Sequence, residues 1–132
     1  MNTEFLGTFK LSSSVNFDEY LAVLGASFIM RKLYRSYTPT LTISTSNNTI
    51  TIEESSPAKT TSITFTIDVE FDETTLVDSQ HKTTTTEKDD GLVQSRTSGT
   101  PSIITRRIEG NQLIETYFIN EITATRIFER QA

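Results

Sequence analysis

The chain has no cysteine and a single histidine among its 132 residues. The lack of cysteine excludes disulfides and thiol chemistry, as is typical of a reducing compartment. His81 alone does not make a histidine metal cluster, and no set of nucleophile, base and orienting residue is evident. We therefore expect no catalytic activity, no metal and no cofactor.

Long apolar runs and an excess of positive charge are also missing. No segment approaches the ~20 apolar residues of a membrane-spanning helix, and no signal peptide is predicted at the start. Twelve basic residues stand against 17 acidic ones, a net charge of −5, so a basic patch for nucleic acid is not expected. These properties predict a cytoplasmic, monomeric protein with one domain over residues 1–132.

Two short helices are predicted within residues 16–36 from the helical spacing of their apolar residues. Asn16 is a suitable N-cap for the first helix, and Glu19 could complete a capping box. Gly25 can end this helix in the left-handed conformation, and Ser27 can cap the second. We therefore expect a helix-turn-helix.

The rest of the chain alternates apolar and polar residues, which is typical of strands with one buried face. The longest alternating run covers residues 62–71, and turn residues separate the others. About ten short strands fit either a barrel or a sandwich, and a helix pair that covers one mouth favours an all-β antiparallel barrel. Such a barrel is too wide to be filled by its own side chains. A hydrophobic content of only 35% agrees with an internal cavity of mixed polarity.

Several motifs resemble those of the intracellular lipid-binding proteins, the fatty-acid-binding family, across nearly the whole chain. The most specific are Gly7-Thr8-Phe9-Lys10-Leu11 and Asn16-Phe17-Asp18-Glu19-Tyr20-Leu21, supported by Leu24-Gly25, Arg31-Lys32, Glu70-Phe71-Asp72-Glu73 and Thr125-Arg126-Ile127-Phe128-Glu129. The resemblance implies a calycin fold, a ten-stranded up-and-down β-barrel (clam) with a helix-turn-helix cap. The implied function is binding and transport of long-chain fatty acids.

The resemblance also implies two inward arginines that bind the ligand carboxylate, which correspond to Arg106 and Arg126. Alternation places Arg107 on the outer face. Phe128 stands where many relatives have Tyr. Intestinal-type relatives share this Phe and pair it with a Tyr on the ninth strand, here Tyr117. Similarity to that type makes Arg106 the main expected anchor.

Glu115 stands where intestinal-type relatives have Gln. A carboxylate there could hold Arg106 in the empty protein and compete with the ligand. We expect Arg96 to point inward and pair with Glu115, which would leave Arg106 free. A strand bulge that turns Glu115 to solvent is the alternative.

The other cavity walls are expected from the helices, the turns near the entrance and the inner strand faces. Ala58 replaces a Phe gate found in many relatives, so the entrance should admit bulkier ligands. The helical residues among the expected walls could equally be plain core. The expected cavity-lining residues are Phe17, Tyr20, Leu21, Met30, Ala58, Leu76, Arg96, Ile104, Glu115 and Phe128.

The energetics assign affinity to the tail and selectivity to the head group. At ~0.8 kcal/mol per methylene, a tail of about sixteen carbons has a gross transfer term near ~12 kcal/mol. A charge-assisted hydrogen bond adds only ~1.5–3 kcal/mol. The arginines would favour a carboxylate over a neutral alcohol such as retinol.

Two alternatives stay open: a retinoic-acid carrier and a carrier of another hydrophobic, bile-acid-like carboxylate. A structural role in membrane stacking is disfavoured by the net charge of −5. Arg31, Lys32 and Arg35 on the second helix could contact anionic membranes transiently, or could simply be a solvated face.

Overall fold

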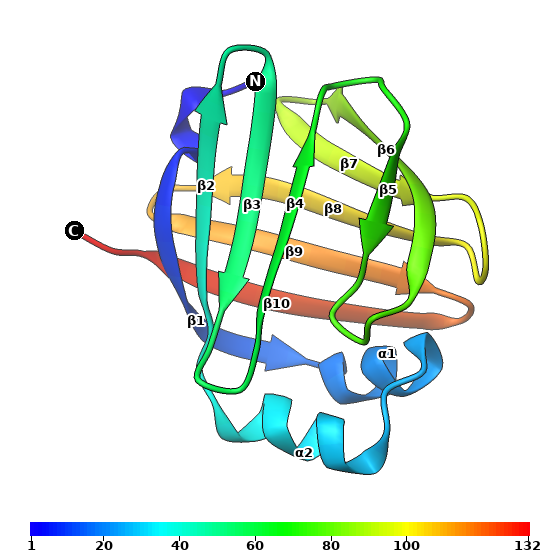
Figure 1. Ribbon diagram of the computed structural model, residues 1–132. Helices are drawn as coiled ribbons and strands as arrows, with labels where there is room; N and C mark the ends of the chain where they lie inside the picture. Colours follow the sequence, from blue (N-terminus) through cyan, green and yellow to red (C-terminus); the bar gives the residue numbers. More distant parts are fainter.

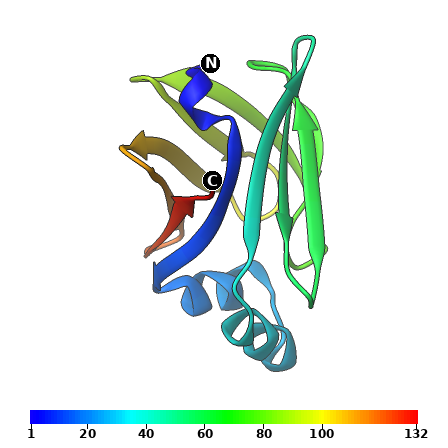
Figure 2. The ribbon, with the colours of Figure 1, turned by 90° about the vertical axis from the view of Figure 1, so that its left-hand side faces the viewer.

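The computed structural model describes residues 1–132 and contains ten antiparallel strands that form one sheet. This sheet curls into a nearly closed barrel, and two helices lie across one of its ends (Figures 1 and 2). The helical elements are η1 (Thr3–Phe5), α1 (Phe17–Leu24) and α2 (Phe28–Ser36). The strands are β1 (Gly7–Val15), β2 (Thr40–Ser46), β3 (Thr49–Ser55), β4 (Thr60–Phe65), β5 (Phe71–Thr74), β6 (Gln80–Lys88), β7 (Gly91–Arg96), β8 (Ser102–Glu109), β9 (Gln112–Ile119) and β10 (Ile122–Arg130).

The strand order is β4-β3-β2-β1-β10-β9-β8-β7-β6-β5. Neighbours in sequence are therefore neighbours in the sheet, and β1 pairs with β10. This arrangement confirms the predicted up-and-down barrel with a helical cap. β4 and β5 are the two ends of the sheet, so the barrel wall has a gap in its backbone pairing there.

The prediction of one continuous strand over residues 62–71 is wrong. β4 ends at Phe65, and the chain turns through Asp68, whose φ of 66° lies in the left-handed region. Aspartate tolerates that conformation better than most residues. Ile67 and Val69 continue the alternation by spacing only, and Val69 is exposed in the turn. Periodicity alone does not distinguish a strand from two strands joined by a tight turn.

Two of the three predicted helix ends are confirmed. The Ser27 hydroxyl accepts a hydrogen bond from the Met30 N–H at 3.1 Å, and Gly25, with a φ of 115°, closes α1. The prediction that Asn16 is a side-chain N-cap is wrong. Its own φ is 59°, and its amide instead donates to the carbonyl oxygen of Thr123 at 3.2 Å. Asn16 thus joins the start of α1 to β10.

None of the helices has the length and apolar content needed to cross a membrane.

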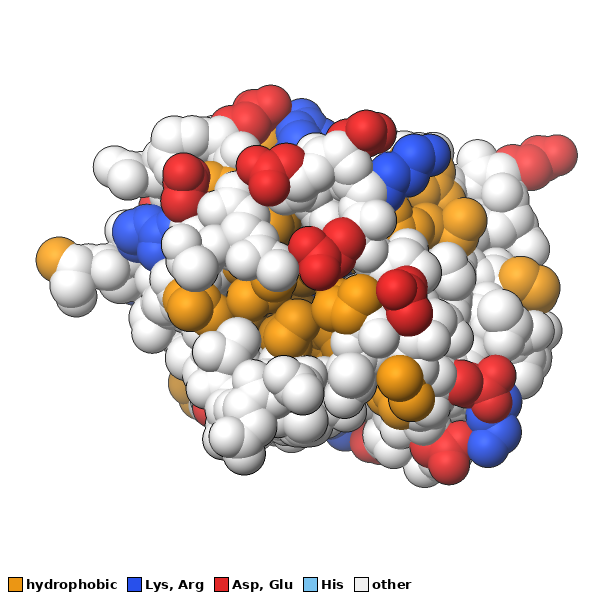
Figure 3. All heavy atoms as spheres, turned by 90° about the horizontal axis from the view of Figure 1, so that it is seen from above, with side chains coloured by type: hydrophobic (Ala, Val, Ile, Leu, Met, Phe, Trp, Pro, Cys, Tyr) orange, Lys and Arg blue, Asp and Glu red, His pale blue; other side chains and the backbone are white.

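Two apolar clusters lie inside the barrel wall. One includes Phe5 and Phe9 and reaches Leu113 and Phe128, and the other packs α1 against β8, β9 and β10. From the end opposite the helices, hydrophobic side chains gather near the centre of the face, bordered partly by charged and partly by uncharged groups (Figure 3). Along β8, β9 and β10, the inward residues between the two clusters are Arg106, Glu115 and Arg126. Together with the buried residues Glu54, Glu73 and Arg96 they form a polar layer, which is the candidate site.

Candidate functional site

Glu115 is the centre of the polar layer. Strand register places it directly opposite Arg106 on β8 and Arg126 on β10. Arg106 Nε donates to Glu115 Oε2 at 2.7 Å, and Arg126 Nη2 donates to Glu115 Oε1 at 3.3 Å. The Glu115 side chain is fully buried, so the alternative of a bulge that exposes it is wrong. The expected Arg96–Glu115 pair is also wrong, because adjacent strands bring the other two arginines to this carboxylate.

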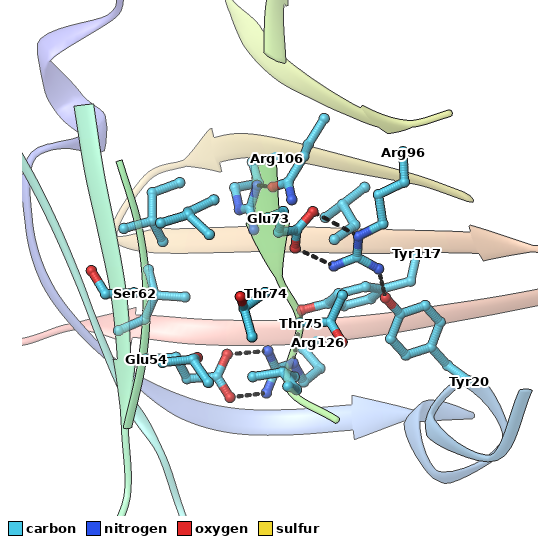
Figure 4. A pocket seen from close by; sticks show the side chains of 17 residues that line it. Tyr20, Glu54, Ser62, Glu73, Thr74, Thr75, Arg96, Arg106, Tyr117 and Arg126 are labelled. Atoms are coloured by element: carbon cyan, nitrogen blue, oxygen red, sulfur yellow. Dashed lines mark hydrogen bonds and ion pairs between the residues drawn. The ribbon is translucent and has the colours of Figure 1, made fainter. Parts of the chain in front are cut away.

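Arg126 is tied across the barrel to Glu54 on β3. Both terminal nitrogens donate to this carboxylate, with Nη1 3.0 Å from Oε2 (Figure 4). Arg126 Nε donates to the Tyr117 hydroxyl at 2.9 Å, and the guanidinium carbon lies 4.1 Å from the centroid of the Phe17 ring. The Tyr117 hydroxyl in turn donates to Glu115. All three guanidinium nitrogens of Arg126 therefore have protein partners.

Arg96 forms a separate pair with Glu73 on β5. Its Nε and Nη2 lie 2.9 and 2.7 Å from the two carboxylate oxygens, a bidentate arrangement visible in Figure 4. Arg96 Nη1 donates to the Tyr20 hydroxyl on α1, and Thr83 donates to Glu73 at 3.0 Å. This pair therefore joins β5, β7 and the helical cap.

Arg106 is bound less completely than its two neighbours. Its Nε donates to Glu115 and its Nη1 to the side-chain oxygen of Gln94, at 2.6 Å. Its Nη2 makes no hydrogen bond to the protein, and the residue lines the interior cavity. Arg106 is thus the one inward arginine with a terminal nitrogen that has no protein partner.

The arginines keep two buried carboxyl groups ionised. Burial opposes ionisation of Glu115, but the charges of Arg106 and Arg126 outweigh it and hold the pKa of Glu115 below its ordinary value. Burial likewise opposes ionisation of Glu73, whose pKa is nevertheless lowered by its hydrogen bonds and charge pairing with Arg96. Burial raises the pKa of Tyr117 well above its ordinary value, so this hydroxyl stays a donor. The layer therefore combines charged acceptors and donors in a site screened from water.

The interior cavity has a volume of about 50 Å³ and opens to solvent. Seven of the residues named from the sequence line it: Tyr20, Leu76, Arg96, Ile104, Arg106, Tyr117 and Arg126. The remaining named residues do not line it. Phe17 lies beneath Arg126, Glu115 behind Arg106, Leu21 and Phe128 in the two apolar clusters, Met30 partly buried on α2, and Ala58 exposed in the β3–β4 turn.

Sequence reasoning missed three polar residues of the site, Glu54, Glu73 and Gln94. The signal for Glu54 was present, because it continues the inward alternation of Ile50 and Ile52 on β3. Glu73 similarly follows Phe71 by two residues on β5. Which arginine each acid meets depends on how the barrel curves.

The turns beside the helical cap are linked by side chains across the gap between β4 and β5. Lys59 Nζ, in the β3–β4 turn, lies 2.8 Å from Asp78 in the β5–β6 turn. The Tyr34 hydroxyl on α2 donates to the carbonyl oxygen of Leu76 at 2.7 Å. Together these contacts join α2 and both turns at the helical end of the cavity.

Comparisons with known proteins agree with this architecture. The Doryteuthis pealeii protein named sodium/calcium exchanger regulatory protein 1 is 34% identical over 130 residues, which cover 98% of both chains. The adipocyte fatty acid-binding protein of Pygoscelis papua is 35% identical over 132 residues, 98% of this chain and 99% of the relative. The solved structure of a Schistosoma mansoni fatty acid binding protein in complex with arachidonic acid has a TM-score of 0.93 at 30% identity, with 98% of both chains covered.

The family comparison covers the same region as the barrel. Residues 6–131 match the model of the Lipocalin / cytosolic fatty-acid binding protein family. This range includes the helical cap, all ten strands and every charged residue of the polar layer. The chain therefore belongs to the Lipocalin / cytosolic fatty-acid binding protein family.

Proposed function

We propose that this protein binds long-chain fatty acids without covalent chemistry and transports them as a cytosolic monomer. The tail would occupy the barrel cavity, and the carboxyl group would bind Arg106. The family match and the fatty acid-binding relatives support the ligand class. The observation that carries the proposal is the free Arg106 Nη2 beside the cavity, which can donate to a carboxyl oxygen.

The proposed roles of the two arginines differ because their protein partners differ. Arg126 is already held by both oxygens of Glu54, by Glu115 and by Tyr117. A ligand would have to displace one of these groups to bind Arg126. Arg106 can accept a ligand with no such displacement, so it is the proposed anchor.

The test compares three single substitutions by titration with oleate. Arg106→Gln should weaken binding about 10- to 100-fold, the equivalent of losing one charge-assisted hydrogen bond. Arg126→Gln should weaken it less. Arg107→Gln is the matched control, since Arg107 is the adjacent residue on the exposed face of β8. A larger loss for Arg126→Gln would contradict the assignment of the anchor.

Mass spectrometry of lipid that co-purifies with the protein tests the ligand class itself. Near-stoichiometric straight-chain fatty acid is expected. A protein that rejects oleate but binds retinoic acid or a bile acid would contradict the fatty-acid proposal and favour one of those carboxylates instead.

We also propose that α2 contacts membranes transiently during ligand transfer. Phe28, Ile29 and Leu33 are exposed on this helix, at 65%, 73% and 43% respectively. Exposed apolar side chains beside basic ones are typical of helices that bind membrane surfaces. Phe28→Ser should slow transfer of a fluorescent fatty acid to anionic vesicles without changing its affinity, and an unchanged rate would contradict the proposal.

A further inference from the structure

The barrel interior has as many buried carboxylates as buried guanidinium groups. Arg96 is paired with Glu73, and Arg126 with Glu54. Arg106 is paired with Glu115, which also contacts Arg126. All six side chains are at most 11% exposed. The three positive charges are therefore neutralised before any ligand enters.

A fatty acid bound to Arg106 would meet Glu115 on the same guanidinium. Glu115 occupies Nε, and the ligand would take Nη2 on the same planar group. Arg126 faces Glu115 from β10, but Glu54 already neutralises it, and Tyr117 contributes only a neutral hydroxyl. A second carboxylate would therefore add one uncompensated negative charge.

The remaining charged groups around the cavity do not compensate this charge. Arg96 is held by both oxygens of Glu73 and by Tyr20. Tyr20 and Tyr117, which also line the cavity, carry no positive charge in either protonation state, and burial raises the pKa of both hydroxyls. When two buried carboxyl groups share one site, protonation of one is strongly favoured, because like charges in a poorly solvated space repel.

We propose that a fatty acid enters this barrel together with one proton, which the ligand carboxyl group and Glu115 share. In this reaction the ionised acid and a proton leave water, and one O–H bond forms within the complex. The ligand carbonyl oxygen then accepts from Arg106 Nη2, and the proton lies between the ligand and Glu115. The two carboxyl groups thus carry one negative charge between them instead of two. This inference rests on the proposed fatty-acid function.

A primary fatty amide has the same hydrogen-bonding groups as the protonated acid. Its carbonyl oxygen can accept from Arg106, and its NH₂ group can donate to Glu115. Oleamide is uncharged between pH 6.5 and 8.5, so it needs no proton to enter. It therefore serves as a probe on the unmodified protein.

The experiment counts protons by calorimetry of oleate binding at pH 7.4 in two buffers with different ionisation heats. Uptake of about one proton per oleate is expected, and the Kd should rise about tenfold per pH unit from 6.5 to 8.5. Oleamide should bind with no proton uptake and no pH dependence. Oleate binding without proton uptake would overturn the inference but leave the carrier proposal intact. Failure of oleate to bind at any pH would overturn both.

Glu115→Gln tests the assignment to this residue. The substitution removes one interior negative charge, so oleate should bind as the carboxylate, with proton uptake near zero and no pH dependence. Glu53→Gln is the matched control, because Glu53 is exposed on the outer face of β3; it should retain the uptake of about one proton. Uptake of a full proton by Glu115→Gln would overturn the role of Glu115.

Discussion

The Arg96–Glu73 pair allows a direct test of how much the buried charges stabilise the barrel. Each side chain is only 4% exposed, and the pair links β5, at one end of the sheet, to β7. Glu73→Gln keeps the shape of the side chain but removes its charge, so Arg96 becomes a buried cation without a carboxylate. Breaking a buried pair in this way costs about 3–5 kcal/mol. The lower value is expected here, because the amide oxygen still accepts one hydrogen bond.

This energy corresponds to a large change in melting temperature. At roughly 2.1 cal/mol/K per residue, the unfolding entropy of a chain of this length is about 0.28 kcal/mol/K. A loss of about 3 kcal/mol then lowers Tm by about 11 °C. Thermal unfolding followed by circular dichroism measures the shift directly. Asp72→Asn is the matched control, because Asp72 neighbours Glu73 but pairs with Lys82 in solvent, and it should leave Tm unchanged.

The pH dependence and a double substitution make the test specific to the charge pair. Folding lowers the pKa of Glu73. The ionised Glu73 therefore stabilises the folded protein fully above the ordinary glutamate pKa of about 4.3, and this stabilisation is lost as the pH falls through the pKa of Glu73 in the folded protein. The difference between wild type and Glu73→Gln should therefore shrink in acid. Adding Arg96→Met should recover most of the lost stability. A double variant as unstable as Glu73→Gln, or a Tm shift below about 3 °C, would refute the reasoning.

Two further predictions concern the wall and the entrance of the barrel. Gly91→Ala should destabilise the protein by about 1–3 kcal/mol in urea unfolding, because its Cβ would lie 2.7 Å from the backbone oxygen of Arg106; an unchanged midpoint would contradict this close approach of β7 to β8. Ala58→Phe should slow fatty-acid exchange in stopped-flow measurements, because the larger side chain would narrow the entrance at the β3–β4 turn. Little change in stability is expected, because Ala58 is exposed. Equal exchange rates would show that this turn does not limit entry.

Most of the fold was predictable from local patterns. Alternation and turn residues identify the strands, and the helical spacing before residue 36 identifies the cap. The failures occurred where a local pattern has two structural solutions. Asp68 turns the chain inside an unbroken alternation, and Asn16 has a left-handed backbone where the sequence favoured a side-chain cap.

The Arg106–Glu115 contact was also within reach of the sequence. Two-residue turns at Gly110-Asn111 and Asn120-Glu121 fix the register of β8, β9 and β10. That register places Glu115 opposite both Arg106 and Arg126, so the expected pair with Arg96 could have been rejected without a structure. The partners of Arg96 and Arg126 could not be found in this way. They come from strands that are not neighbours of β7 and β10 in the sheet, and their meeting depends on barrel curvature.

These long-range pairs add to the contacts that keep the barrel closed where its backbone pairing is interrupted. No ladder joins β4 to β5, and these two strands are connected by the intervening turn and by the stacked rings of Phe65 and Phe71. Glu54 connects β3, next to one end, to Arg126 on the opposite wall, and Glu73 connects β5, the other end, to Arg96. Both ends are thus attached through the polar layer to the continuous wall of β7 to β10. Replacing these pairs by apolar residues of equal volume could preserve stability, but it would remove the charge balance that we propose couples ligand entry to the uptake of one proton.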